Sequence, residues 1–225
     1  MNKAVFWDFD GTLVYSNESF LYSLDCALLS CGYEFEKSVI KSFLTSACSW
    51  NDPDKAYTDK VKEAWWTELL GKVKIFCQNS GVSEADSDNV CRAFRHNVIN
   101  YEYRLYEDAE DILSFCISKG YRNYLLSNNF PELTKVVERF GLSRYFSDHF
   151  ISANIGYEKP RKEIFEYALR AADLPDICYM AGDNPIADIK GAQAAGLKTI
   201  LVHKKSDDIR PDFCCLELQE IKHIL

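Results

Sequence analysis

Hydrophobic residues follow two different patterns along the chain. Residues 4–9 form a short apolar run of β-prone side chains, which predicts a buried strand that ends before Gly11. From about residue 15 to residue 97, apolar residues recur three or four positions apart instead. This spacing predicts an all-helical region, with loops that contain helix caps at 51–54 and 79–88, where Asn, Asp, Ser, Pro and Gly gather.

After about residue 100, strand-like and helix-like segments alternate. Helices are expected at residues 108–120, 131–141, 160–172 and 185–196. Strands are expected at residues 121–129, 148–154, 177–183 and 198–203, with a further short strand at 212–218. This alternation predicts right-handed crossovers and a doubly wound parallel sheet, so the fold class is α/β.

The helical region separates the first strand from the rest of this pattern. We therefore expect an α/β core made of residues 1–14 and 98–225, with a helical domain of residues 15–97 inserted into it. The chain has 225 residues, of which 47% are hydrophobic. That is enough for one large or two modest domains with a sizeable core.

The charge balance limits the class of partner. A net charge of −8 argues against a nucleic-acid-binding protein, which usually carries a basic face. It does not exclude a phosphorylated substrate, because one metal ion or lysine reverses the field locally. No apolar run approaches the length of a membrane span, and residues 4–10 are too short and too acidic for a signal peptide. We therefore expect no association with membranes.

Cysteine usage points to a reducing compartment. The chain has nine cysteines, no CxxC pair, and four histidines that are not at zinc-binding spacing from them. Mostly buried, reduced thiols are typical of a cytoplasmic protein. Nothing in the sequence requires more than a monomer.

Polar residues gather where the predicted parallel strands end. The carboxyl ends of such strands lie at one edge of the sheet, and ligands bind there. Acids that share this edge would repel one another, and a divalent cation bound by oxygen, such as Mg²⁺, relieves that repulsion. The residues are Asp8 and Asp10 after the first strand, Ser127, Asn128 and Asn129 after the second, Lys159 before a helix, Asp183 after a later strand, and Asp188 in the helix that follows.

Four motifs make the sequence resemble a known family. "DFDGTL", "LLSNN", "EKP" and "GDNPIAD" occur in the order and approximate spacing of the four motifs of the haloacid dehalogenase-like (HAD) phosphohydrolase superfamily. The chain is most similar to the group with a helical cap inserted just after the first motif, and the resemblance covers its whole length. One such motif is moderately specific, whereas four in register are strong.

The resemblance implies a role for each acid. Asp8 would be the nucleophile that attacks phosphorus and forms an aspartyl-phosphate. Asp10 would be the general acid for the leaving alcohol and then the base for water, with its backbone carbonyl on the metal. Asp183 would bind Mg²⁺ directly, and Asp188 would bind it through water or orient Lys159.

The resemblance also implies how the phosphoryl group is held. Gly11 would allow the sharp turn that brings backbone N–H groups to the phosphate, and Thr12 would steady that turn. Ser127 would donate to a phosphoryl oxygen, with Asn128 nearby. Lys159 would neutralise charge on the nucleophile and the phosphoryl group.

Each residue alone also has a purely structural interpretation. Asp8 and Asp10 could be solvated strand-end acids, Ser127 a turn hydroxyl and Lys159 a surface lysine. Asp183 and Asp188 could cap the helix that begins near residue 185. The four motifs in register favour the catalytic interpretation.

The helical region contains candidate substrate contacts. Aromatic residues at helical spacing are more typical of packing than of binding, and this applies to Tyr22, Trp50, Tyr57, Trp65 and Trp66. Residues just after the first motif lie near the expected hinge and are equally open to either role, and these are Tyr15, Asn17 and Glu18. Elsewhere, His203 is expected to be structural, and Cys214 and Cys215 to alternate between the surface and the core of an edge strand.

The expected function is Mg²⁺-dependent dephosphorylation of a small phosphorylated metabolite through an aspartyl-phosphate. The motifs leave open a phosphomutase on the same scaffold and a non-catalytic HAD-fold binding protein. A dehalogenase has no need of Asp10, Asp183 and Asp188. A phosphonate hydrolase needs a desolvated lysine in the cap, and nothing in the sequence marks one among Lys41, Lys55, Lys60 and Lys62. The sequence does not identify the metabolite.

Overall fold

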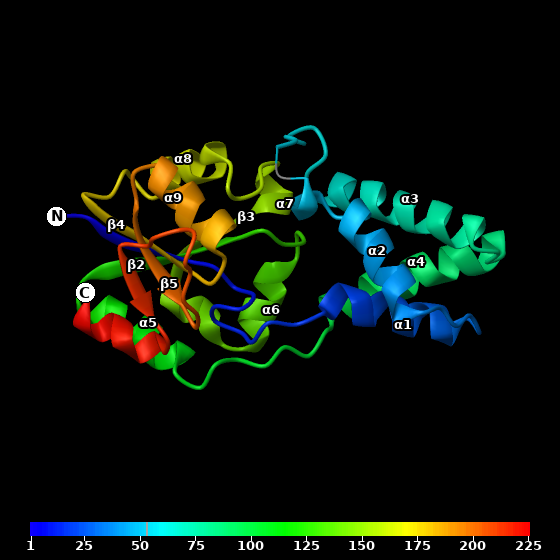
Figure 1. Ribbon diagram of the computed structural model, residues 1–225, viewed down its shortest axis with the longest axis horizontal. Helices are drawn as coiled ribbons and strands as arrows, with labels where there is room; N and C mark the ends of the chain where they lie inside the picture. Colours follow the sequence, from blue (N-terminus) through cyan, green and yellow to red (C-terminus); the bar gives the residue numbers. More distant parts are fainter. Residues whose placement is uncertain (53) are drawn as a thin grey trace.

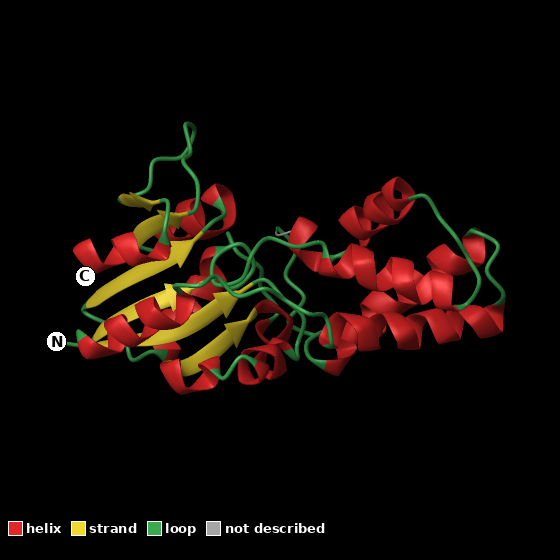
Figure 2. Ribbon diagram, turned by 90° about the horizontal axis from the view of Figure 1, so that it is seen from below, coloured by secondary structure: helices red, strands yellow, loops and turns green. Residues whose placement is uncertain are grey.

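A six-stranded parallel sheet lies at one end of an elongated molecule (Figure 1, Figure 2). The computed structural model describes residues 1–52 and 54–225. The strand order is β3-β2-β1-β4-β5-β6, and every neighbouring pair is parallel. The strands are β1 (Lys3–Trp7), β2 (Tyr121–Ser127), β3 (Phe146–Ile151), β4 (Ile177–Gly182), β5 (Lys198–Val202) and β6 (Phe213–Cys215). This confirms the predicted α/β class and parallel sheet.

Both faces of the sheet are covered by helices. In β1, Val5 and Trp7 point to one face and Ala4 and Phe6 to the other, and all four are fully buried. A central parallel strand therefore reads as a continuous apolar run. The first face is covered by α5 (Ala109–Ser118), α6 (Leu133–Arg139) and η4 (Leu218–His223). The second face is covered by α8 (Lys162–Ala171) and α9 (Gly191–Ala194).

The helices that follow β1 pack together at the other end of the molecule (Figure 1). We call them, with the segments between them, the helical module. They are α1 (Ser19–Ser30), α2 (Lys37–Ala47), the short η1 (Ser49–Asn51), α3 (Glu63–Asn79) and α4 (Glu84–Ile99). Within the module, α1 packs mainly on α4, and α4 in turn on α3.

One buried cluster runs without a break from the sheet into the helical module. At the junction, the Phe130 ring lies 6.2 Å from that of Phe20 and 6.1 Å from that of Trp66. Close by, the Glu132 carboxylate accepts hydrogen bonds from Trp66 Nε1 at 2.7 Å and from Arg95 at 2.9 Å. The module is therefore packed against the sheet-bearing part by both apolar and charged contacts.

Two sequence predictions in the helical region need correction. The loop expected at 79–88 is limited to residues 80–83, because α3 runs to Asn79 and α4 begins at Glu84. Ser83 caps α4, its Oγ accepting the Asp86 backbone N–H at 3.1 Å, so a helix cap does lie in this stretch and only the loop is shorter than predicted. In the loop expected at 51–54, Asn51 belongs to η1, and Pro53 lies outside the described residues.

The strand expected at 148–154 also differs. β3 ends at Ile151, and Ser152–Ile155 form a short helix, α7. The Ser152 Oγ accepts the backbone N–H of Asn129 at 3.0 Å, and Gly156 turns the chain with a positive φ of 92°. This turn directs the following loop back towards the sheet edge.

Further along, the helix expected at 185–196 is divided. It begins as a π-helical turn, η3 (Pro185–Lys190), and continues as α9. The last strand is shorter than expected, because η4 begins at Leu218. In the edge strand β6, Cys214 is exposed and Cys215 is buried, as the alternation predicted.

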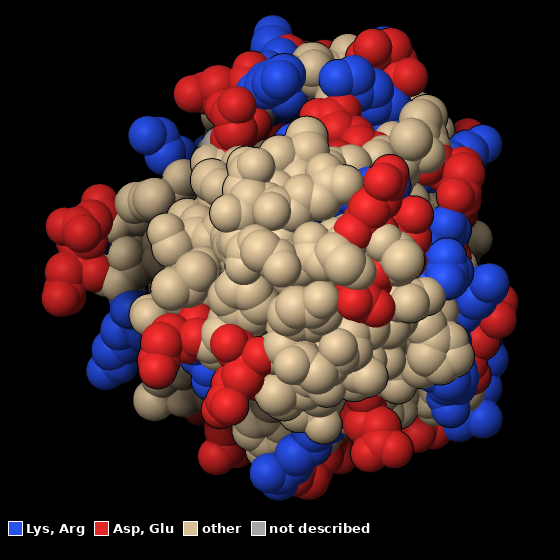
Figure 3. All heavy atoms as spheres, turned by 90° about the vertical axis from the view of Figure 1, so that its right-hand side faces the viewer, with Lys and Arg blue, Asp and Glu red and all other residues tan. Residues whose placement is uncertain are grey.

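Figure 3 shows the surface at the end formed by the helical module. Acidic and basic side chains alternate around its margin, and uncharged side chains occupy its centre. The exposed large hydrophobic residues of the module are Tyr22, Leu29, Val39 and Ile75. None of the helices in the described part of the chain combines the length and the apolar character that crossing a membrane would require.

Candidate active site

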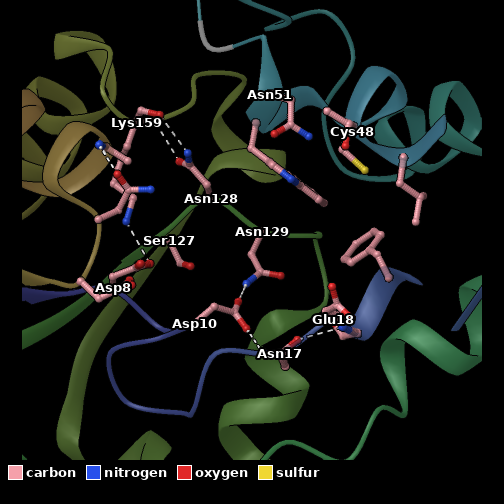
Figure 4. Close-up of a pocket in the computed structure, with 18 of the residues that line it drawn as sticks. Asp8, Asp10, Asn17, Glu18, Cys48, Asn51, Ser127, Asn128, Asn129 and Lys159 are labelled. Carbon is pink, nitrogen blue, oxygen red and sulfur yellow. Dashed lines mark hydrogen bonds and ion pairs between the residues drawn. The ribbon is translucent and has the colours of Figure 1, made fainter. Parts of the chain in front are cut away.

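The predicted site residues meet at the carboxyl ends of β1, β2 and β4. Asp8 directly follows β1, Ser127 ends β2, and Asp183 directly follows β4, while Lys159 comes from the loop before α8. They line one cavity of about 610 Å³ between the sheet edge and the helical module. Figure 4 shows Asp8, Ser127 and Lys159 on one side of this cavity and residues of the module, including Asn51, on the other.

Three carboxylates cluster at the sheet edge beside the cavity, and two of them, Asp8 and Asp183, line it. Asp8, Asp183 and Asp188 each offer an oxygen, and these oxygens lie within 4.8 Å of one another. Burial, followed by the charge of Asp8, raises the pKa of Asp183. A β-carbon on Gly182 would lie 2.3 Å from the Asp188 carboxylate, so only glycine lets that side chain approach the strand. Clustered hard oxygen ligands of this kind fit a divalent cation.

Lys159 is buried in the middle of these acids, with only 1% of its side chain exposed. Its Nζ donates to Asp188 Oδ1 at 2.6 Å and to the Leu126 carbonyl at 2.9 Å, and lies 2.9 Å from Asp8 Oδ1. Burial alone would lower the pKa of Lys159, but the charges of Asp188 and Asp8 outweigh it and raise the pKa. The lysine is therefore a buried cation, and the surface-lysine interpretation is wrong.

Asn128 holds the backbone of Lys159. Its Oδ1 accepts the Lys159 N–H at 2.7 Å, and its Nδ2 donates to the Lys159 carbonyl at 2.9 Å. Both ends of the amide are thereby engaged with the loop, as the dashed lines in Figure 4 show. Ser127, beside it, is 1% exposed and lines the cavity. A contact of either residue with a phosphoryl group stays a prediction.

Asp10 lies in a different environment from Asp8. Its Oδ1 accepts Asn17 Nδ2 and its Oδ2 accepts Asn129 Nδ2, both at 2.6 Å. The two amides are oriented in turn by the backbone N–H groups of Ser19 and Phe130, each 3.0 Å from an amide oxygen. Burial raises the pKa of Asp10 to about 6, although the hydrogen bond from Asn17 opposes it.

The turn after β1 depends on Gly11. Its φ is +75°, and a β-carbon there would lie 2.7 Å from Asp183 Cγ. The Thr12 backbone N–H donates to the Phe9 carbonyl at 3.2 Å, and its own carbonyl accepts His203 Nε2 at 3.0 Å. Thr12 thus steadies the turn through its backbone. The His203 ring also stacks on Tyr106, with ring centroids 3.9 Å apart, and a structural role for His203 stays a prediction.

We predict that Gly11→Ala will disable the site without unfolding the protein. The new methyl group would displace the Asp183 carboxylate, and the positive φ adds strain of about 1–3 kcal/mol. We expect activity to fall by about a hundredfold, as small displacements at reacting centres can cause. Steady-state kinetics and thermal denaturation measure the two effects.

Gly32→Ala is the matched control for this variant. Gly32 has a φ of +85°, but nothing lies within 4 Å of a β-carbon built there. We expect Gly32→Ala to lose about as much stability through backbone strain as Gly11→Ala does, and to keep its activity. Equal activity losses in the two variants would contradict the proposed clash with Asp183.

Sequence reasoning did not select Lys204 as a site residue, and it placed Asn129 at a strand end without giving it a role. Lys204 Nζ lies 2.7 Å from Asp183 Oδ2, and about half of its side chain is exposed. Lys204 follows β5, which is the neighbour of β4 in the sheet. Its position just after a predicted strand could have identified it as a site residue. The sheet edge thus carries four carboxylates and two ammonium groups, which belong to Asp8, Asp10, Asp183, Asp188, Lys159 and Lys204. When all are ionised, two negative charges remain, which one divalent cation would balance.

The candidate residues of the helical region separate into two groups. Asn17, Glu18 and Trp50 line the cavity. The others pack elsewhere: Tyr15 stacks on Tyr106, Tyr22 is exposed, and Tyr57, Trp65 and Trp66 are buried. Lys41 also lines the cavity, but its side chain is 66% exposed and pairs with Glu18 at 2.8 Å. It is not a desolvated lysine of the kind that phosphonate hydrolysis needs.

Comparison with known sequences identifies relatives of this chain. The model of the haloacid dehalogenase-like hydrolase family matches residues 2–196. A phosphoserine phosphatase of Thermus thermophilus is 33% identical over 125 residues, which are 53% of this chain and 50% of that protein. The pyrimidine 5'-nucleotidase YjjG of Escherichia coli is 36% identical over 108 residues, 45% of this chain and 48% of that protein. The matches thus span about half the length of these curated relatives.

Solved structures share the fold over the whole chain. The HAD-hydrolase YfnB of Bacillus subtilis, in a magnesium-bound crystal structure described as revealing interdomain movement, superposes with a TM-score of 0.75 at 23% identity. The match covers 100% of this chain and 98% of that one. At 23% identity this similarity establishes the fold only. The substrate and the reaction have to be inferred from the site residues.

Proposed function

Because the chain belongs to the haloacid dehalogenase-like hydrolase family, we propose that it is a Mg²⁺-dependent phosphatase acting on a small phosphorylated metabolite. One observation carries this proposal: two carboxylates two positions apart occupy opposite electrostatic environments. Asp8 lies beside the Lys159 ammonium, whereas burial raises the pKa of Asp10. Environments that separate two carboxyl groups in this way suit one to act as a nucleophile and the other as an acid.

In the proposed reaction, Asp8 attacks the phosphorus atom. One Asp8 oxygen forms a bond to phosphorus, the bond from phosphorus to the leaving alcohol breaks, and an aspartyl-phosphate results. Lys159 sits 2.9 Å from Asp8 and supplies positive charge to the carboxylate and the phosphoryl oxygens. Asn128 holds the lysine backbone in place for this task.

Asp10 serves as the acid and then the base. In the first step it donates a proton to the leaving alcohol oxygen. In the second it accepts a proton from the water that attacks phosphorus, while the bond from phosphorus to the Asp8 oxygen breaks and inorganic phosphate is released. Its two hydrogen bonds, from Asn17 and Asn129, favour the ionised form, while burial favours the neutral form. This balance suits a group that must both give and take a proton.

The residues proposed to hold Mg²⁺ are Asp8, Asp183, Asp188 and the backbone carbonyl of Asp10. The clustered carboxylate oxygens support this assignment. Asp188 is fully buried and accepts both Lys159 Nζ and the Asn184 N–H, so it also fixes the lysine. When bound, the cation would stabilise negative charge on the phosphoryl oxygens.

The remaining assignments concern the phosphate and the two parts of the chain. We assign Gly11 and Thr12 to the turn that faces the phosphate, and Ser127 to a hydrogen bond with a phosphoryl oxygen.

Residues 1–14 and 98–225 would be the catalytic core and residues 15–97 a cap, since the helical module forms the other wall of the cavity. All these residues come from one chain, so a monomer should suffice, and nine free cysteines fit the reducing cytoplasm.

A phosphomutase is the second candidate, because it would use Asp8 and Asp10 in the same way. A non-catalytic HAD-fold binding protein is the third. The presence of Asp10, Asp183 and Lys159 in one cavity supports an active enzyme. The relatives named as a phosphatase and a nucleotidase favour hydrolysis over transfer.

The deciding experiment is hydrolysis of p-nitrophenyl phosphate with Mg²⁺ and with EDTA. We expect release of inorganic phosphate that requires the metal. No release in either condition would overturn the enzymatic proposal. A panel of sugar phosphates, nucleotides and phosphorylated acids then identifies the substrate, and an isomeric phosphate as product, without free phosphate, would show a mutase.

Asp183→Ala is predicted to lose Mg²⁺ affinity. The variant removes one of three clustered carboxylates and also relieves their repulsion, so it should unfold no earlier than the metal-free wild type. Titration calorimetry and thermal denaturation with and without Mg²⁺ measure both effects. Asp208→Ala, an exposed acid between β5 and β6, is the control and should bind Mg²⁺ normally. Unchanged affinity in Asp183→Ala would remove this residue from the site.

A further inference from the structure

The helical module contacts the sheet-bearing part a second time, just before the catalytic lysine. The Tyr57 N–H donates to the Gly156 carbonyl at 2.9 Å, and the Lys62 N–H donates to the Ala153 carbonyl at 2.8 Å. The fit is close, because a β-carbon on Gly156 would lie 2.5 Å from the Thr58 Cα. The module is thus attached to the stretch of chain that leads into the Lys159 loop.

Glu158 is the buried acid at this contact. It is 0% exposed, and its Oε1 accepts hydrogen bonds from two hydroxyl groups of the module, those of Ser49 at 2.7 Å and Tyr57. Ser49 Oγ in turn accepts Trp65 Nε1 at 3.0 Å. The other Glu158 oxygen, Oε2, is buried without a hydrogen-bond partner among the described residues. Burial raises the pKa of Glu158, and the bond from Tyr57 opposes this.

The chain neighbours of these residues belong to the cavity. Ser49 lies between Cys48 and Trp50, and both line the wall that the module contributes. Glu158 directly precedes Lys159, which lines the opposite side of the cavity. Figure 4 shows Cys48 and Lys159 facing the same cavity from these two sides. A single carboxylate therefore joins the wall of the cavity to the catalytic cation.

We propose that Glu158 is a positioning residue that couples the placement of the helical module to the placement of Lys159. The coupling rests on the proposed function, because it gives Lys159 its catalytic role. When the module occupies the position seen here, Ser49 and Tyr57 hold Glu158, and the lysine beside it is held against Asp8. When the module moves away, the Glu158 carboxylate loses both donors, and the Lys159 loop loses an anchor.

Glu132 provides the comparison that separates coupling from simple attachment. It also belongs to the sheet-bearing part, and it also accepts hydrogen bonds from the module, from Trp66 and Arg95. Glu132 lies just before α6, however, and not next to a residue of the acid cluster. Loosening the module at Glu132 tests attachment alone, whereas loosening it at Glu158 also releases Lys159.

The kinetic test uses variants on both sides of the contact, assayed with p-nitrophenyl phosphate and Mg²⁺. Glu158→Ala should lower kcat about 10- to 100-fold, since small misplacements of a catalytic group have effects of this size. Glu158→Gln keeps an acceptor oxygen and should stay within about threefold of the wild type. Ser49→Ala combined with Tyr57→Phe should lower kcat about tenfold, with no further loss when added to Glu158→Ala, because the residues act as one unit. Glu132→Gln should leave kcat within about twofold.

Hydrogen exchange measures the coupling without relying on activity. The Lys159 N–H donates to Asn128 at 2.7 Å and should be protected. Ser49→Ala with Tyr57→Phe should speed exchange in residues 156–161 by at least about fivefold, although both substitutions lie in the module. Glu132→Gln should not change it. Unchanged exchange in the double variant, or an equal rise in Glu132→Gln, would overturn the coupling. Absence of phosphatase activity in the wild type would instead overturn the proposed function and leave the exchange result to decide the coupling.

Discussion

Asp8→Asn is expected to abolish turnover while the protein stays folded. An amide is nearly isosteric with a carboxylate but is a poor nucleophile, so no aspartyl-phosphate can form. We expect kcat for p-nitrophenyl phosphate to fall by at least about a thousandfold, as loss of a nucleophile typically causes. Lys159 keeps Asp188 as a partner at 2.6 Å, so the buried cation is not left unpaired in the variant.

The measurement pairs steady-state kinetics with thermal denaturation of the same preparation. Denaturation shows whether the variant is folded, so that lost turnover reports on chemistry. Asp148→Asn, which replaces an exposed aspartate of β3, serves as the control for the substitution itself. Wild-type kcat in purified Asp8→Asn would show that another group attacks phosphorus.

Asp10→Asn is expected to give the second largest effect, and its size should depend on the leaving group. Loss of a general acid typically slows a reaction by about a hundredfold to ten-thousandfold. The loss should be large for an alkyl phosphate, whose alkoxide needs a proton. It should be smaller for p-nitrophenyl phosphate, whose phenolate hardly needs one. Metal and phosphate binding should be largely retained.

The surroundings of Asp10 call for a second variant in this test. Asn17 and Asn129 both present N–H₂ groups to Asp10, and Ser19 and Phe130 hold those amides in that orientation. An asparagine at position 10 would place its own N–H₂ group against one of these N–H₂ groups, and this unpaired donor would lower the stability of the folded protein. Asp10→Ala avoids this clash and should show the same dependence on the leaving group. Equal losses for the two substrates in single-turnover measurements of the first step would mean that Asp10 is not the acid.

The sequence by itself determined the fold class and the set of residues at the sheet edge. The alternation after about residue 100 predicted the parallel sheet, and the ends of its strands placed Asp8, Ser127 and Asp183 together. This works because parallel strands bring their carboxyl ends to the same edge whatever the distance between them in the chain. The resemblance to the HAD-like hydrolases is likewise confirmed by the family match over residues 2–196.

Local patterns were less reliable for the exact bounds of the elements. Residues 152–154 read as strand but form α7, because the chain turns where the Ser152 hydroxyl accepts the Asn129 N–H. Residues 79–88 predicted a loop with a helix cap, and Ser83 is such a cap, but the helix begins directly after it, so the loop is shorter than predicted.

Only the tertiary structure decided how the acids differ and what surrounds them. The resemblance gave Asp8 and Asp10 different roles, but only the structure shows their different partners, which are Lys159 for Asp8 and two asparagine amides for Asp10. Asp183 contacts Lys204, and Glu158 contacts Ser49. Nothing in the sequence around either residue of a pair predicts its partner. Periodicity reports which face of an element is buried. The hydrogen-bond partner of a buried polar group depends on how whole elements pack against one another. For Glu158 it depends on the position of the helical module relative to the sheet.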